Sequence, residues 1–165
     1  GGANWAKNVS SASSSQFAEA AASLAPQPET KIGGPSVLTG NIIDNARVKL
    51  GSFGLDRWLD WDCGAFGSES AVRSDLVAVA QRKAAELRDF DPARDATVLI
   101  GDTHRDVEAG VDGGARVVGV ATGGETVDEL MAAGADVAIP SLSDVQAALD
   151  AFAFARSLGP VFVGS

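Results

Sequence analysis

Residues 97–106 read TVLIGDTHRD, an apolar run that ends in a glycine and is followed by polar residues. The β-prone residues Thr97–Ile100 predict a buried strand, and Asp106–Val111 predicts the helix after it. A strand that passes directly into a helix is typical of a parallel α/β sheet. Asp102 then stands at the carboxyl end of the strand, where open parallel sheets bind ligands.

The same alternation of strands and helices extends to both sides of this segment. Arg116–Val120 predicts the next strand, and Thr126 with Glu129 forms a capping-box pattern at a helix start. Ser143 with Gln146 predicts the start of the last helix. The pattern therefore predicts an α/β fold with a parallel sheet flanked by helices. The other predicted elements are strands at 36–38, 64–67 and 137–139 and helices at 42–53 and 76–87.

The beginning of the chain has a different composition. Five of the six residues from Ser10 to Ser15 are serine, which favours solvated, flexible chain. An alanine-rich stretch at 16–24 predicts a short helix. We therefore predict three parts: a flexible Ser/Ala-rich segment with a short helix at 1–35, an α/β core at 36–155, and a tail at 156–165 in which Val161–Val163 is a candidate for an extra strand.

Charge and hydropathy restrict the partners and the location. The 165 residues include 13 Lys and Arg against 22 Asp and Glu, a net charge of −9. This balance argues against nucleic acid or an anionic membrane as a partner, but not against a small phosphorylated molecule held by a local positive site. With no apolar run of membrane-spanning length and no signal-peptide pattern, a cytoplasmic location is expected.

Two clusters at predicted strand ends carry the candidate chemistry. Thr39-Gly40-Asn41 offers a hydroxyl and backbone N–H groups at a helix N-terminus, which suits a phosphate; it also fits an ordinary helix cap. Asp102 and Asp106 are close enough in sequence to share a crevice, and oxygen-only ligands suit Mg²⁺. The alternative is that they cap the following helix and interact with its dipole.

Four further side chains are candidates for chemistry, and three of them have two interpretations. Lys49 and Arg73 are candidates to neutralise a phosphate, or charges on solvated helix faces. His104 is the only histidine, and it is either a general acid or a solvated helix residue. Cys63 has no second cysteine to pair with, and it fits a small buried apolar residue best.

An ordered set of motifs carries a family resemblance. The motifs are Leu38–Asn41, Ala46–Leu50, Gly64–Gly67 and Ile100–Asp106, followed by Ala109-Gly110, Gly114-Ala115 and Val120–Gly123. On these motifs the chain resembles the haloacid dehalogenase-like hydrolases, in particular their phosphoglycolate-phosphatase-like branch, over roughly residues 36–150.

The resemblance implies a Rossmann-like core and phosphate-ester hydrolysis through an aspartyl-phosphate, with Mg²⁺ as cofactor. It implies that Thr39 hydrogen-bonds the phosphoryl group, that Asp102 holds the metal and that Asp106 supports it. The family's third motif supplies a cation to the phosphate. Lys49 and Arg73 both remain candidates for that role, and Lys49 is preferred.

The chain departs from the family at its first motif, Asp-x-Asp-Gly-Thr, which supplies the nucleophile. No aspartate precedes Asp44, and the usual cap domain has no counterpart. The strand of this motif normally lies between the strands that end at Thr39 and Asp102. We therefore expect Val161–Val163, or a strand exchanged with a second copy in a homodimer, to fill that place.

Two functions follow as expectations. The first is a Mg²⁺-dependent phosphatase core, impaired because the nucleophile motif is absent. The second is a non-catalytic domain, derived from that family, which binds phosphate or Mg²⁺ or another protein. The expected partner is a small phosphorylated molecule.

Overall fold

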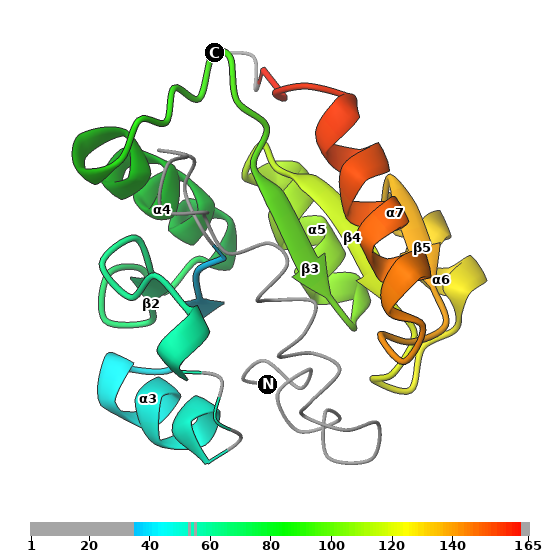
Figure 1. Ribbon diagram of the computed structural model, residues 1–165, viewed down its shortest axis with the longest axis horizontal. Coiled ribbons are helices and arrows are strands. Elements are labelled where there is room, and N and C mark those ends of the chain that lie inside the picture. Colours follow the sequence, from blue (N-terminus) through cyan, green and yellow to red (C-terminus); the bar gives the residue numbers. More distant parts are fainter. Residues whose placement is uncertain (1–34, 53, 55, 163–165) are drawn as a thin grey trace.

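The computed structural model describes residues 35–52, 54 and 56–162. Their strands are all parallel, and helices cover both faces of the sheets, which confirms the predicted α/β class (Figure 1). The first sheet pairs β1 (Leu38–Thr39) with β2 (Ala65–Phe66), and the second has the order β3 (Val98–Gly101), β4 (Arg116–Val120), β5 (Val137–Ile139). The described helices are α3 (Ile43–Gly51), the 3-10 turn η1 (Asp56–Trp58), α4 (Arg73–Leu87), α5 (His104–Asp112), α6 (Val127–Ala132) and α7 (Val145–Ser157).

Helices pack on both faces of the three-stranded sheet. Residues 117–120 of β4 are buried, whereas residues 98–100 of β3 are only partly buried, so the predicted full burial of the strand at 97–100 is wrong. Alternate residues of β4 point to opposite sides: Val118 packs with Phe152 of α7, and Val117 packs with Val107 of α5 and Leu130 of α6. The period-two alternation of a strand thus gives each helix layer its own apolar contact surface. Figure 1 shows α7 in front of this sheet and α5 behind it.

The two-stranded sheet is enclosed in the same way. Leu50 of α3 packs with Phe66 of β2, and Leu76 of α4 packs with Ala65. Helix α4 also contacts α5, so it connects the two sheets. Among the described strands, β1 and β3 do not pair with each other.

Several predicted boundaries need correction. The first strand includes Thr39 instead of ending at residue 38, and β3 ends at Gly101, one residue later than predicted. Helix α7 continues to Ser157, beyond the predicted core boundary at 155. Val161 and Phe162 form no strand, and Val163 lies outside the described residues, as do residues 1–34 with their predicted short helix. The described part of the tail therefore does not supply the expected extra strand.

The start of α7 was also predicted one residue too early. Asp144, not Ser143, is the N-cap: its carboxylate accepts a hydrogen bond from the Ala147 N–H at 3.0 Å. The Gln146 side chain donates to Asp150 instead of returning to the cap. None of the helices in the described ranges combines the length and the apolar character needed to cross a membrane.

Replacing the observed cap should weaken α7, whereas replacing the predicted cap should not. Asp144→Ala is expected to lower the free energy of unfolding by about 1 kcal/mol, the usual effect of losing an N-cap. Ser143→Ala is expected to change it by less than about 0.5 kcal/mol. Urea unfolding followed by circular dichroism measures both. Equal losses in the two variants would contradict the assignment of Asp144.

Candidate active site

The Thr39-Gly40-Asn41 turn follows β1 and leads into α3. Thr39 is 3% exposed, and its Oγ1 accepts hydrogen bonds from the N–H and the Nδ2 of Asn41, each at 3.2 Å. Ile42 is the N-cap of α3 and makes no side-chain cap bond. The turn therefore does not cap the helix through a side chain, and no described residue accepts the Thr39 hydroxyl proton, which can donate to a ligand.

Gly67, at the end of β2, holds this turn from the other side. Its N–H donates to the Asn41 carbonyl at 3.0 Å. A Cβ placed on Gly67 would lie 2.0 Å from the Gly40 carbonyl oxygen, so only glycine allows this approach. The end of β2 thus fixes the backbone of the Thr39-Gly40-Asn41 turn.

Asp102 follows β3 and is fully buried. Neither of its carboxylate oxygens has a hydrogen-bond partner among the residues that the structure describes. Burial, together with the nearby charge of Asp106, raises the pKa of Asp102 to about 6. A buried carboxylate without partners is costly, and native structures keep one mainly where a ligand or ion compensates it.

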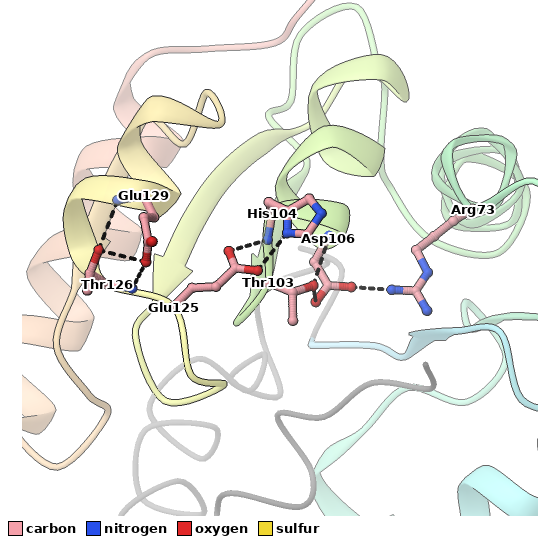
Figure 2. A network of polar contacts seen from close by, with 7 residues as sticks. All are labelled: Arg73, Thr103, His104, Asp106, Glu125, Thr126 and Glu129. Atoms are coloured by element: carbon pink, nitrogen blue, oxygen red, sulfur yellow. Dashed lines mark hydrogen bonds and ion pairs between the residues drawn. The ribbon is translucent and has the colours of Figure 1, made fainter.

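Asp106 lies in the first turn of α5 and is fully engaged. One carboxylate oxygen pairs with the Arg73 guanidinium, and the other accepts from the Thr103 hydroxyl at 2.8 Å (Figure 2). Thr103 in turn caps α5 by accepting from the Asp106 N–H. Asp106 is therefore held as a support beside Asp102 instead of offering two free oxygens.

Arg73 begins α4 and connects the two clusters. Besides pairing with Asp106, its Nη2 would lie 3.9 Å from a Cβ placed on Gly40. The guanidinium is thus close to both the turn after β1 and the first turn after β3. It places a positive charge at the edge of the sheets where both strands end.

Lys49 is not brought to this edge. It lies in the last turn of α3, roughly 9 Å along the helix axis from Ile43, and it is exposed. Of the two predicted cations, the structure therefore brings together Arg73, not Lys49, with Asp106 and the Thr39-Gly40-Asn41 turn.

Burial and hydrogen bonding to Asp60 raise the pKa of the Cys63 thiol to about 11, so it is protonated at neutral pH.

The loop between β4 and α6 lies over Asp102 and closes the site on that side. A Cβ on Gly123 would lie 2.7 Å from an Asp102 carboxylate oxygen. Glu125, in the same loop, accepts from the His104 N–H at 2.7 Å and contacts His104 Nδ1 at 2.6 Å. Glu125 raises the pKa of His104 through this hydrogen bond and its charge. The glycine pair after the strand was the available signal, but nothing in the sequence pairs Glu125 with His104.

The donor set at Asp102 fits Mg²⁺. This ion prefers oxygen ligands, keeps several waters and commonly takes only one or two carboxylates together with phosphate oxygens. Asp102 supplies a buried, uncompensated carboxylate of this kind. In the described ranges, no three acidic, histidine or cysteine side chains are grouped to hold a metal ion. Water and a phosphorylated ligand would therefore complete the coordination.

A comparison with protein families matches one part of the chain. Residues 74–145 match a family model described as HAD-hydrolase-like. The match covers less than half of the chain and includes Asp102 and Asp106, whereas Thr39 and Arg73 precede it. It supports a relationship of this segment to the haloacid dehalogenase-like hydrolases. No curated protein matches the chain.

Proposed function

We propose that the chain carries the Mg²⁺- and phosphate-binding part of a haloacid dehalogenase-like phosphatase site, and that it binds a small phosphorylated molecule. The observation that carries this proposal is Asp102, fully buried with no partner on either oxygen among the described residues. The matched family and the predicted resemblance to its phosphoglycolate-phosphatase-like branch support the same ligand class.

Two groups of this chain would act on the phosphoryl group. The Thr39 hydroxyl would donate a hydrogen bond, and Arg73 would contribute positive charge. Bound Mg²⁺ supplies charge that stabilises the phosphoryl oxygens. Asp106 holds the Arg73 side chain in place through their ion pair.

Turnover is expected to be slow, because covalent phosphoryl transfer needs a positioned carboxylate nucleophile. Asp102 is the proposed metal ligand. The other carboxylates named at this edge are paired: Asp106 with Arg73, Glu125 with His104, and Glu69 with Lys83. This observation favours a second function, in which the domain binds a phosphorylated molecule with Mg²⁺ and does not hydrolyse it.

One experiment tests both functions. Binding of phenyl phosphate is measured by calorimetry with Mg²⁺ and with EDTA, and p-nitrophenyl phosphate hydrolysis is followed under the same conditions. Mg²⁺-dependent binding with turnover supports the phosphatase. Mg²⁺-dependent binding without turnover supports the non-catalytic domain. Folded protein that binds neither Mg²⁺ nor phenyl phosphate would refute the proposal.

Replacing each of the two candidate cations should show which one contacts the phosphate. Arg73→Ala is expected to weaken phenyl phosphate binding about 10- to 100-fold, because a hydrogen bond to a charged group contributes about 1.5–3 kcal/mol. Lys49→Ala, which removes a charge at the far end of α3, is expected to change the affinity less than about twofold. A larger effect of Lys49→Ala would show that Lys49, the residue preferred from sequence, reaches the phosphate. Calorimetric titration of both variants gives the comparison.

A further inference from the structure

The loop that follows β4 lies directly against Asp102. A Cβ added to Gly123 would lie 2.6 Å from the Asp102 carbonyl oxygen and 2.7 Å from its Oδ2. Glycine has no side chain, so it is the Gly123 backbone that lies against Asp102. The position of the loop therefore determines how closely the Asp102 carboxylate is packed. With no hydrogen-bond partner in the described part of the chain, the Asp102 side chain depends on such packing for its orientation.

Two side-chain anchors hold this loop in place. At its far end, Thr126 and Glu129 form the capping box of α6. Nearer to Gly123, both carboxylate oxygens of Glu125 are used by one residue, His104: Oε2 accepts from its N–H at 2.7 Å and Oε1 contacts Nδ1 at 2.6 Å. Figure 2 shows Glu125 reaching from the loop to the first residue of α5.

This contact joins the two segments that surround the Asp102 carboxylate. His104 is two residues after Asp102, and Glu125 is two residues after Gly123. His104 is about half exposed, and exposed ion pairs contribute little to overall stability. The consequence of the Glu125–His104 contact is therefore the position of the loop rather than the stability of the fold.

We propose that Glu125 is a positioning residue for the cation site: by binding His104 with both oxygens, it holds Gly123 against Asp102 and keeps the Asp102 carboxylate oriented. The inference rests on the proposed function, since it concerns how well the same site binds Mg²⁺. Groups that hydrogen-bond a metal ligand directly commonly change metal affinity 10- to 100-fold when they are replaced. Glu125 acts on Asp102 through the position of Gly123, so the lower end of that range is expected.

Three variants distinguish an effect of the loop's position on Mg²⁺ binding from an effect of the Glu125 charge. Glu125→Ala is expected to weaken Mg²⁺ binding about tenfold. Glu125→Gln keeps an acceptor for the His104 N–H and a donor for Nδ1, so it is expected to stay within about threefold of the wild type. Glu108→Ala removes an exposed carboxylate from α5 as the matched control, and it is expected to change the affinity less than about twofold.

Mg²⁺ affinity is measured by calorimetry, and the amide exchange of Gly123 and Gly124 is measured in EDTA. Faster exchange in Glu125→Ala alone, together with the expected order of affinities, supports the inference. Equal affinities in Glu125→Gln and Glu125→Ala would show an effect of charge and overturn it. If the wild type binds Mg²⁺ and Glu125→Ala binds it equally well, this inference fails while the proposed function stands. If the wild type binds no Mg²⁺, both fail.

Discussion

Asp102→Asn is expected to stabilise the metal-free protein and to abolish its Mg²⁺ binding. The Asp102 carboxylate is buried without a hydrogen-bond partner in the described ranges, and its pKa rises from an ordinary value of 3.8 to about 6. At pH 8 the Asp102 carboxylate of the folded protein is ionised, although its burial favours the protonated form. Removing the charge should raise the free energy of unfolding by up to about 3 kcal/mol, from about 1.36 kcal/mol per pKa unit.

The pH dependence of the wild type follows from the same pKa. Because the folded state holds the Asp102 proton more tightly than the unfolded state, unfolding releases a proton between these pKa values. The contribution of Asp102 to the free energy of unfolding is therefore fully present below about pH 3.8 and declines as the pH rises to about 6. Above that pH this group causes no further loss. Asp102→Asn should lack this decline.

Urea unfolding of both proteins in EDTA, at several values between pH 4 and pH 8, measures the difference. Asp89→Asn makes the same chemical change at an exposed position and serves as the control. Added Mg²⁺ should stabilise the wild type and leave Asp102→Asn unchanged, since only a ligand of the folded state shifts the equilibrium. A less stable Asp102→Asn protein at pH 8 would contradict the unpartnered state of this carboxylate.

Gly67→Ala is expected to be the most damaging of the small substitutions at the site. The added Cβ would lie 2.0 Å from the Gly40 carbonyl oxygen and 2.5 Å from its carbon, and these are backbone atoms that cannot rotate away. The strands β1 and β2 would have to separate at their carboxyl ends, with a loss of about 3 kcal/mol, the upper part of the usual range for overpacking.

Gly40→Ala provides the matched comparison across the same contact. Among the described residues its Cβ would meet only Arg73 Nη2, at 3.9 Å, which is ordinary van der Waals contact with a flexible side chain. The free energy of unfolding should change by less than about 1 kcal/mol. Chemical unfolding of the two variants gives the loss in the free energy of unfolding for each. Similar losses in both would mean that the turn and β2 do not approach each other as the structure shows.

Much of the fold was predictable because its signals are local. The strands at Arg116–Val120 and Val137–Ile139 were predicted with their observed bounds, and the capping box at Thr126 is confirmed. Apolar periodicity and cap residues lie within one segment, so one segment is enough to recognise them. Ser143 was mistaken for the cap of α7 because it and Asp144 are adjacent and both residue types suit a cap.

The candidate site depends on contacts that no local pattern encodes. Placing Asp102 at a strand end required only the apolar run before it. Preferring Arg73 over Lys49 required knowing that α3 carries Lys49 away from the edge, while α4 packs on α5 and brings Arg73 to Asp106.

The amino-acid pattern alone accounts for the parallel α/β class, the order of its elements and the carboxylates at a strand end. The folded chain adds the separation into two sheets and the partners of Asp106 and Glu125. It also shows that Asp102 is buried with no hydrogen-bond partner among the described residues. The physical reason is range: periodicity acts over a few residues, whereas burial and ion pairs arise where segments distant in sequence pack together.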